Sequence, residues 1–574
     1  MRRVSGMKNV AVRSIELHDT ITIWSPEKIR KIVDFMVKYD MNTLVFHQND
    51  IVDFMVYPSF LYSKDNKPIA DRNIYNVYKQ TWEAYYYQSP HPHVILDEKP
   101  IYLELIRYIV SLATSKGIDV YFQTKELWFY DAVFEQTGVM KNGVVCPCEP
   151  YWWETYLPVK YDEFFANFPE IAGIITSTAT RESRASLAHG KCGCELCKNA
   201  DMQEWQKKVI MSIYQPIKKH GKKLVIRDFS YYPTEQSGVR AGVLDLPDDI
   251  GISIKNVPQD FYPTFPHNAL IGHVGNREQW IEYEPMGEYF GFGVVPCELL
   301  EDVRDRIKYA LQNGATGFTS RVDWEALPNH SAFDTVNALN VYAAAMFSLD
   351  PDLPGERVYR AWLEDYGLFA ENLSEEGKEA CVRRMMEVLG KSQSVVFKSC
   401  YVKKFLFGTN SKIPADIAYQ DFVTEEFHGL HKWFPEHKHD MDMTSENIAS
   451  FISEKQEAID EANRHYDLLA RENPGLDETF YNFLLGQLDI TKMYAEQFYV
   501  VAKVYFYAKG AEALRDYNGA KEALRELRVF EEKLAAYNIP VFVYPTTVLL
   551  CLDKLRYYRI DAEERMEEIY RDLK

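Results

Sequence analysis

Short apolar runs and longer amphipathic stretches alternate along the first 340 residues. The segment Pro26–Tyr39 predicts a helix, because its apolar residues recur every three or four positions. Short apolar runs bounded by turn residues predict buried strands. The predicted strands are Val10–Leu17, Asn42–Phe46, Ile118–Phe122, Ile171–Thr176, Lys223–Phe229, Ile250–Lys255, Trp280–Tyr283 and Thr316–Ser320. Eight strands with helix-length connections are typical of a (β/α)8 barrel, although the connection after the sixth strand is short for a helix.

After Asp334 the helical periodicity continues without intervening strands. The predicted helices there are Thr335–Phe347, Gly355–Tyr366, Ser374–Gly390, Ser445–Arg471, Glu478–Ala508 and Ala520–Tyr537. We therefore predict the α/β fold class, with a (β/α)8 TIM barrel over 1–340 and an all-helical C-terminal domain over 341–574. A chain of 574 residues is long enough for both.

An aromatic-rich insertion over about 51–100 separates the second and third predicted strands. Its aromatic residues are Phe54, Tyr57, Phe60, Tyr62, Tyr75, Tyr78, Trp82, Tyr85, Tyr86 and Tyr87. Insertions after strands lie on the carboxyl face of a barrel, where active sites are built. The insertion is therefore either a wall or lid over the site or a packed excursion with a small core of its own.

Composition limits the classes of partner. The chain has 65 Lys and Arg against 84 Asp and Glu, a formal net charge of −19. So acidic a chain has no electrostatic means of holding a phosphate backbone, which argues against nucleic acid as a partner. Aromatic residues make up 14%, including 39 Tyr and 10 Trp, as suits either a sugar-stacking surface or a large core.

The N-terminal segment MRRVSGMKNVAVRS has basic residues but lacks the apolar core of a secretory signal. No run in the sequence approaches the roughly 18 apolar residues that a membrane helix needs. Nine cysteines in 574 residues do not make a disulfide framework. We expect a soluble, cytoplasmic protein with no membrane partner.

Carboxylates follow three of the predicted strands, at the end of the barrel where catalytic residues gather. Glu182 comes after the fourth strand, Asp260 after the sixth and Glu288 after the seventh. Glycoside hydrolysis needs a protonated carboxylic acid for the leaving oxygen and a carboxylate that activates water or attacks carbon. Each acid taken singly is more often a surface or loop-capping residue, so the prediction depends on their convergence.

Other polar residues at strand ends are candidates for substrate binding. His47 ends the second strand, Lys125 follows the third, and Lys255 and Asn256 end the sixth. Arg227, near the end of the fifth strand, has two interpretations. It either grips an anionic substrate group or is paired with Asp228 or another acid of the rim.

Five stretches of the sequence are similar to segments of one enzyme family: Pro169–Thr176 (PEIAGIIT), Ile226–Tyr231 (IRDFSY), Ile254–Phe261 (IKNVPQDF), Glu282–Gly291 (EYEPMGEYFG), and Asn337–Ala343 (NALNVYA) followed by Leu349–Leu353 (LDPDL). They resemble, in this order, the PDFGGFLVK, WRAFVY, IKNGPIDF, QEYLG and LAQANLYAFGRLAWNPDLS segments of family 67 glycoside hydrolases, the xylan α-glucuronidases. The matches keep a constant order between about Val10 and Tyr366. The helical C-terminal region also fits the layout of that family.

The resemblance implies an inverting hydrolase. Glu182 stands at the position of the family's acid and would protonate the glycosidic oxygen. Asp260 and Glu288 match the family's paired bases and would activate water on the opposite face of the sugar. Arg227 matches a residue that binds the carboxylate of the uronic acid, which favours the substrate-gripping interpretation.

Departures from the family pattern indicate an altered sugar pocket. Thr178 stands where the family has a lysine that engages the carboxylate of the sugar, and Lys125 could replace that charge. The sequence RESRASL replaces SEGQPGP around the acid, and Leu17–Thr20 (LHDT) lacks the tryptophan of NHWDN. We expect a divergent member or relative without the family's N-terminal domain.

Five of the nine cysteines lie in two short stretches, Cys146–Cys148 (CPC) and Cys192–Cys197 (CGCELC). Thiolates at Cys-x-Cys-x-x-Cys spacing can surround one tetrahedral zinc, with a fourth ligand from Cys146 or Cys148. We select the ligand set Cys148, Cys192, Cys194 and Cys197; the alternative is reduced thiols without a ligand role. Such a zinc would be structural and would fix the loop that carries Glu182, while catalysis would need no cofactor.

The sequence thus predicts an exo-acting, inverting glycoside hydrolase of the α-glucuronidase type, with a role in xylan degradation. It would remove a terminal uronic acid from an oligosaccharide. A glycosidase acting on a neutral sugar and a catalytically silent carbohydrate-binding barrel stay open as alternatives. The helical C-terminal domain is the expected surface of a homodimer, as its placement in the family suggests.

Overall fold

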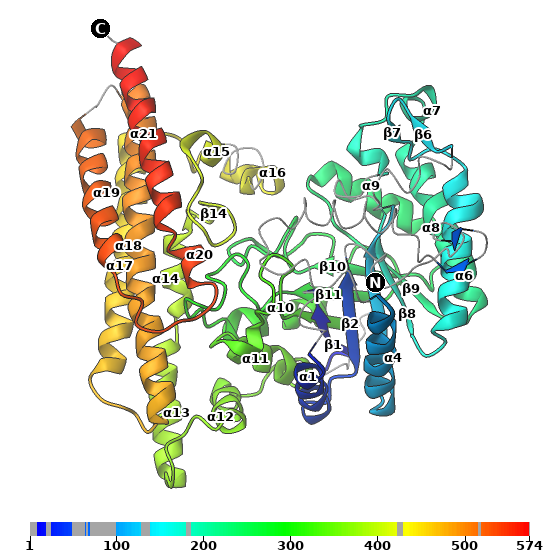
Figure 1. Ribbon diagram of the computed structural model, residues 1–574, viewed down its shortest axis with the longest axis horizontal. Helices are drawn as coiled ribbons and strands as arrows, with labels where there is room; N and C mark the ends of the chain where they lie inside the picture. The colour runs from blue at the N-terminus through cyan, green and yellow to red at the C-terminus, as the bar shows by residue number, and fades with distance from the viewer. Residues whose placement is uncertain are drawn as a thin grey trace.

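The computed structural model describes residues 9–18, 25–48, 63–64, 67–68, 99–127, 138–178, 185–421, 429–514 and 518–572. Eight parallel strands close into a barrel (Figure 1). They are β1 (Val12–Leu17), β2 (Thr43–Gln48), β5 (Asp119–Lys125), β8 (Gly173–Ser177), β9 (Lys223–Arg227), β10 (Gly251–Lys255), β11 (Gln279–Tyr283) and β12 (Gly317–Arg321). Each strand pairs with the next, and β12 pairs with β1 from Val12↔Gly317 to Glu16↔Arg321, which closes the barrel. The predicted barrel is confirmed.

Helices surround the barrel on its outside. They are α1 (Pro26–Lys38), α4 (Lys99–Ser115), α6 (Leu157–Asn167), α8 (Met202–Lys219), α9 (Pro233–Leu244), α10 (Leu300–Gln312) and α11 (Ala338–Leu349). Local signals set their ends: the Ser25 side chain accepts the backbone N–H of Lys28 at the start of α1, and Pro26 occupies its first turn. The connection from 256 to 278, between β10 and β11, contains no helix, as its length indicated.

Side-chain alternation along the strands divides the barrel interior into two layers. The apolar layer consists of Val45, Tyr121, Ile175, Val225 and Trp280, which pack together. Two residues further along the same strands stand His47, Gln123, Ser177, Arg227 and Glu282, all of them buried. The barrel therefore has an apolar floor and, at the carboxyl ends of its strands, a polar mouth.

Two glycines allow the floor to pack closely. A Cβ at Gly317 would lie 2.6 Å from the Trp280 ring, and one at Gly173 would lie 2.3 Å from the backbone oxygen of Lys223. Both distances are far below van der Waals contact, so these two strand positions admit no side chain.

The helix α11 completes the barrel. It follows β12 and packs against α10, and its residue Ser348 accepts the backbone N–H of Val10 at 2.8 Å. Almost every residue of α11 is buried, which is typical of a helix covered on all sides. The predicted boundary between residues 340 and 341 falls within this helix.

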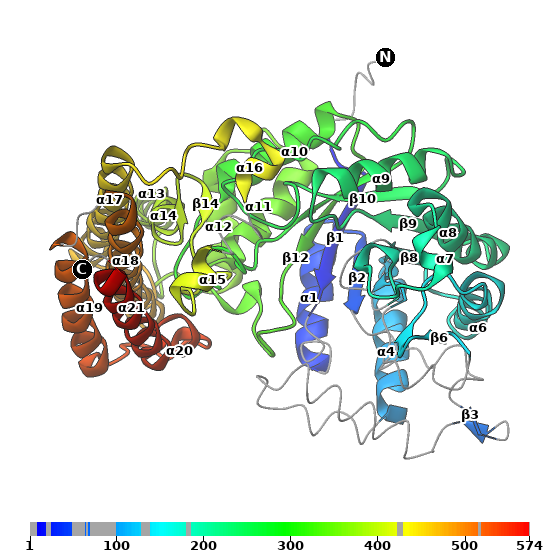
Figure 2. The same cartoon turned by 90° about the horizontal axis from the view of Figure 1, so that it is seen from above.

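The described part of the chain after α11 is mostly helical. Its helices are α12 (Gly355–Asp365), α13 (Glu375–Leu389), α14 (Ser392–Ser399), α15 (Ile417–Asp421), α16 (Leu430–Trp433), α17 (Ser445–Ala470), α18 (Glu478–Leu514), α19 (Asn518–Ala536), α20 (Thr546–Leu549) and α21 (Leu552–Asp572). The long helix α18 packs against α17, α19 and α21, and together they form a bundle to one side of the barrel (Figures 1 and 2). In the described part of the chain, no helix is both long and apolar enough to cross a membrane.

Several short elements lie in the connections between these strands and helices. They include the hairpins β3–β4 (Ser63–Lys64, Lys67–Pro68), β6–β7 (Met140–Lys141, Val144–Val145) and β13–β14 (Tyr401–Val402, Phe405–Leu406), the π-helix η5 (Trp152–Tyr156), the 3-10 turns η6 (Leu187–His189), η7 (Ala332–Asp334) and η9 (Pro435–His437), and the helical turn α7 (Glu195–Lys198). The segment containing β14, α15 and α16 lies between the bundle and the barrel in both views (Figures 1 and 2). Apart from β3, β4 and the start of α4, the predicted aromatic insertion lies outside the described residues.

Candidate active site

A buried ion pair occupies the polar mouth. The Arg227 Nε donates to both carboxylate oxygens of Glu282 at 2.9 Å, and its Nη2 lies 2.8 Å from Oε2. The Ser253 hydroxyl donates to the same carboxylate at 2.6 Å. Burial by itself raises the pKa of Glu282, but the guanidinium outweighs burial and holds that pKa below its ordinary value. Of the two interpretations of Arg227, the structure shows the pairing, and its partner is the rim acid Glu282.

Glu16 faces this ion pair from β1 and is fully buried. Its Oε1 lies 2.7 Å from His47 Nδ1 and accepts a weaker hydrogen bond from Gln123 at 3.4 Å. Burial, followed by repulsion from Glu282, raises the pKa of Glu16 to about 7. The mouth therefore contains a carboxyl group whose charge changes near neutral pH.

His18 and His47 stack face to face beside Glu16, with ring centroids 3.8 Å apart. Burial is the main cause that lowers the pKa of both imidazoles, that of His18 to about 4. Both rings are therefore neutral near pH 7. Each Nε2 is buried and has no hydrogen-bond partner among the described residues, so each ring offers one polar atom to a ligand.

Asp260 lies in the loop after β10 and is held by two donors. Lys255 Nζ donates to its Oδ1 at 2.7 Å, and the Tyr289 hydroxyl donates to its Oδ2 at 2.6 Å. Although burial alone raises the pKa of Asp260, Lys255 and Tyr289 lower it below its ordinary value. The preceding residue, Gln259, adopts the left-handed conformation at φ 70°, which non-glycine residues rarely adopt and which fits a loop shaped for a function.

Glu288 follows β11 in the next loop of the mouth. Arg321 Nη1 lies 3.4 Å from its Oε2, and Asn410 Nδ2 donates to its Oε1 at 2.7 Å. Burial, with repulsion from Asp260 and Glu284, raises the pKa of Glu288 well above the ordinary glutamate value despite the nearby Arg321. Glu288 and Asp260 thus interact electrostatically, and their pKa values move in opposite directions.

The loop that carries Glu288 is fixed by Glu284. Its Oε1 accepts the backbone N–H groups of Gly287 at 3.0 Å and of Glu288 at 2.6 Å. Gly287 has φ 107°, and a Cβ there would lie 3.0 Å from Asn337 Nδ2, so this tight turn requires glycine. Burial raises the pKa of Glu284 to about 7.

The helical part of the chain supports the same loop from outside the barrel. Ser411 donates its hydroxyl to the backbone oxygen of Glu288 at 2.8 Å and accepts the N–H of Gly291 at 2.7 Å. The Tyr401 hydroxyl donates to the backbone oxygen of Tyr289 at 3.0 Å. The position of Glu288 therefore depends on residues beyond the barrel.

Most of the predicted binding residues converge around the Phe229 ring. Lys125 Nζ, the Arg227 guanidinium carbon and Lys255 Nζ lie 5.4, 5.0 and 3.9 Å from its centroid. Asn256 is buried at the end of β10, and its Oδ1 has no hydrogen-bond partner among the described residues. His47 lies in the same mouth, stacked on His18 as described above.

The predicted acid Glu182 lies outside the described residues. The strand before it, β8, ends at Ser177, which is buried with Thr178 in the barrel mouth. The chain therefore enters the segment 179–184 from the carboxyl face, and the role of Glu182 stays a prediction.

Sequence reasoning missed several residues that complete the site: Glu16, Glu282, Tyr289, Arg321 and Asn410. Strand alternation could have found Glu16, Glu282 and Arg321, because each occupies an inward-facing strand position. Asn410 has no such signal, because it lies 122 positions from Glu288 in a region that was predicted only as helical.

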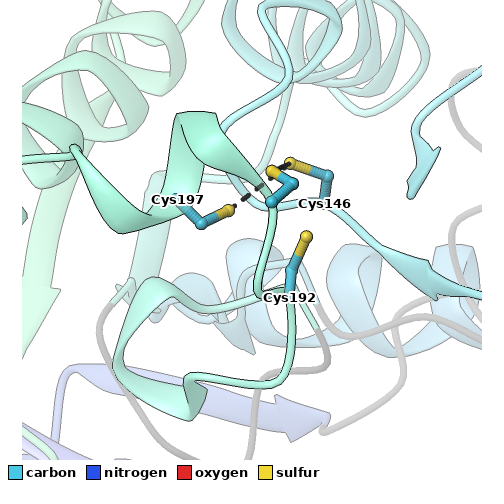
Figure 3. Close-up of side chains that lie close together, drawn as sticks. Cys146, Cys192 and Cys197 are labelled. Carbon is cyan, nitrogen blue, oxygen red and sulfur yellow. Dashed lines mark hydrogen bonds between the residues drawn. The ribbon is translucent and has the colours of Figure 1, made fainter. Parts of the chain in front are cut away.

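The cysteine cluster forms where the chain after β7 meets the connection between β8 and α8 (Figure 3). The four thiols that come together are Cys146, Cys192, Cys194 and Cys197. The group thus contains Cys146 in place of the predicted Cys148, and whether it binds a metal stays a prediction. Cys146 is buried directly after β7, where its N–H bonds to the oxygen of Val139, while the side chain of Cys148 lies outside the group and interacts most strongly with that of Cys197.

Comparison with known proteins gives structural likeness without sequence likeness. No family model matches the chain, and no curated protein matches it. Among solved structures it is similar to a GH138 enzyme targeting pectin rhamnogalacturonan II, with TM-score 0.57 and 11% identity over 92% of this chain and 62% of that one. The chain thus spans less than two thirds of the length of that enzyme.

Weaker matches include an O-GlcNAc hydrolase mutant from Thermobaculum terrenum, with TM-score 0.44 and 13% identity over 97% of this chain and 95% of that one. Another is a beta-N-acetylhexosaminidase from Bacteroides fragilis NCTC 9343, with TM-score 0.39 and 15% identity over 62% and 72%. At such identities the first match shows the fold alone, a barrel with additional helices. The likeness to family 67 remains a resemblance of motifs.

The Arg227–Glu282 pair predicts a large stability effect. Replacing Arg227 alone by Met leaves a buried, uncompensated carboxylate and should lower the free energy of unfolding by about 3–5 kcal/mol. The double variant Arg227→Met/Glu282→Gln should recover much of this loss, as measured by urea unfolding of all members of the double-mutant cycle. As a control, Arg525→Met breaks an exposed helix pair with Glu522 and should cost less than about 1 kcal/mol. A cost at Arg227 no larger than this control would contradict the pairing.

Glu284 predicts a pH dependence of stability. Its pKa is about 7 in the folded chain against an ordinary value of 4.5, so between these pH values the folded state binds the proton more tightly than the unfolded state. The contribution to the free energy of unfolding is therefore fully present below pH 4.5 and falls by up to about 3 kcal/mol as the pH rises to 7. Urea unfolding should show that Glu284→Gln removes this part of the decline. The same change at the exposed residue Glu376 should leave the decline as it is.

Proposed function

We propose that this protein is a glycoside hydrolase whose water-activating groups are Asp260 and Glu288. The observation that supports this proposal is a pair of carboxyl groups in one mouth, after the adjacent strands β10 and β11, with pKa values displaced in opposite directions; Glu288 is buried and the Asp260 side chain is 19% exposed. Environments that separate two carboxyl pKa values commonly divide acid and base roles. Glycoside hydrolysis depends on such a division.

Asp260 is the base in this proposal. Lys255 and Tyr289 keep its carboxylate ionised and fix its orientation, so it can take a proton from the water that attacks the anomeric carbon. Glu288, whose pKa is raised by burial, binds the same water. Glu182, placed by its motif, donates a proton to the departing oxygen, and the sugar configuration is inverted.

A terminal uronic acid is the proposed substrate class. Lys125 Nζ lies 5.4 Å from the Phe229 ring at the mouth, and its charge would attract a carboxylated sugar, whereas Arg227 and Lys255 are paired with Glu282 and Asp260. The neutral rings of His18 and His47 provide hydrogen bonds for sugar hydroxyls.

The proposal predicts which aryl sugars are hydrolysed. Incubated with 4-nitrophenyl α- and β-glycosides of glucuronic, galacturonic, neutral and N-acetylamino sugars, the full-length protein should release nitrophenol from a uronide. Proton NMR of the first product formed should show the anomer opposite to that of the substrate. Hydrolysis of neutral sugars only would contradict the uronic acid. Calorimetric sugar binding without any product would contradict the hydrolase itself.

Variants of the three acids separate their roles. Asp260→Asn and Glu288→Gln should each lower kcat/KM about 10²–10⁴-fold on all substrates, since water activation is needed whatever the leaving group. Glu182→Gln should lose most activity on natural oligosaccharides but keep activity on 4-nitrophenyl substrates, whose leaving group needs no protonation. The control is Asp248→Asn. Asp248 is exposed and precedes β10, whereas Asp260 follows β10 at the opposite end of the strand. If Glu288→Gln retains activity on nitrophenyl substrates, Glu288 is the acid and the assignment to Glu182 is wrong.

Asn410 predicts a contribution from the helical part of the chain. Its amide donates to Glu288, and Asn410→Gly removes this donor while suiting the left-handed backbone at φ 55°. We expect kcat to fall about tenfold, with KM little changed and the pH profile shifted upward, because a hydrogen bond to a charged group contributes about 1.5 kcal/mol. The control Asn372→Gly changes an exposed asparagine with nearly the same backbone at φ 60°. Equal profiles for the two variants would show that Asn410 has no part in the reaction.

A further inference from the structure

The sulfur atoms of the cysteine cluster have the spacing of a metal site. The Sγ atoms of Cys146, Cys192, Cys194 and Cys197 all lie within 4.8 Å of one another. The Cys146 sulfur lies 3.6 Å from that of Cys194 and 3.5 Å from that of Cys197 (Figure 3). Four thiolates at about 2.3 Å from a tetrahedral zinc stand about 3.8 Å apart. A disulfide would bring two of them to about 2.05 Å, and none of the four is so bonded.

Backbone and side-chain groups around the cluster suit bound thiolates. The backbone N–H groups of Cys148 and Cys197 lie close enough to the sulfurs of Cys146 and Cys194 to stabilise their thiolates. Four thiolates around Zn²⁺ carry a net charge of about −2, which N–H donors and nearby cations stabilise. Lys141, on the hairpin that leads to Cys146, lies close enough to Cys146 and Cys194 for its charge to interact with theirs.

The segment that contains three of these cysteines has almost no hydrophobic core. Within Gly190–Ala200 the only buried residue is Cys192, and the helical turn α7 buries none. Leu196, its one aliphatic side chain larger than alanine, is 52% exposed. Hydrophobic burial therefore contributes little to its folded position, which is the situation in which small folded segments use a metal.

We propose that Cys146, Cys192, Cys194 and Cys197 bind one structural Zn²⁺. All four positions around the ion would be filled by protein, so it has no open position for chemistry. The ion would join the hairpin β6–β7 to the connection between β8 and α8. Each thiol gives up its proton on binding, and the ion undergoes no redox change. This inference goes beyond the hydrolase proposal and does not depend on it.

The metal content of the full-length protein tests the proposal. Purified without chelator, the protein should contain about one zinc per chain by inductively coupled plasma mass spectrometry. Mercurial titration of its thiols should release that zinc to a colorimetric indicator. Cobalt(II) added after zinc removal should give the intense thiolate-to-metal absorption and visible bands of tetrahedral sulfur coordination. Iron in place of zinc, or no metal with a cysteine disulfide found by peptide mass spectrometry, would overturn the proposal.

Two serine variants form a matched pair two residues apart. Cys146→Ser should lower the zinc content by about tenfold or more and increase protease cleavage within 190–200. Cys148→Ser should keep about one zinc per chain, because Cys148 contributes a backbone N–H that serine retains. Circular dichroism verifies that both variants are folded. Equal zinc content in the two would show that the thiol cluster is not the ligand set.

Discussion

Charge inside the barrel is the constraint on which the rest of this structure depends. Alternation along parallel strands sends every second side chain toward the barrel axis, and here those positions include Glu16, Arg227 and Glu282. Removing an ion from water costs several kcal/mol unless a partner compensates. Arg227 compensates the charge of Glu282 through two hydrogen bonds. The remaining repulsion between Glu282 and Glu16 disappears when Glu16 binds a proton, which its raised pKa favours. The candidate catalytic groups Asp260 and Glu288 lie in the loops after β10 and β11, at the same end of the barrel.

The same principle distinguishes Asp260 from Glu288. Glu288 is buried and Asp260 is partly buried, so desolvation acts on both in the same direction. Asp260 has an ammonium group and a phenol within hydrogen-bond distance, whereas Glu288 has an amide, a more distant guanidinium and two acidic neighbours. The difference between their surroundings, rather than between aspartate and glutamate, separates their affinities for a proton. A substrate that brings its own charge into the mouth would shift this balance again.

The sequence was sufficient for the barrel because strand length, helix periodicity and the turn residues between them are local signals. Strands such as Lys223–Arg227 and Gly251–Lys255 lie within a residue or two of their predicted bounds. Site residues at strand ends, such as Asp260, could be predicted for the same reason. The sequence could not show which side chains neutralise one another, as Arg227 and Glu282 do. It also could not show which distant loop contacts the site, as the loop of Asn410 does. Both depend on packing in three dimensions. The choice between Cys146 and Cys148 depends on packing as well, since only the path of the hairpin decides it.

The hydrogen bonds that Asn410, Ser411 and Tyr401 make to the loop of Glu288 have a consequence for how this protein can change over evolution. A barrel of this type is often regarded as an interchangeable module that recombines with accessory domains. Here, recombination that replaced the helical part would keep both carboxyl groups and still remove one wall of the reaction centre. The barrel and the segment from Tyr401 to Ser411 must therefore be inherited as a unit, and a substitution or insertion in that segment can alter the site without any change in a barrel strand.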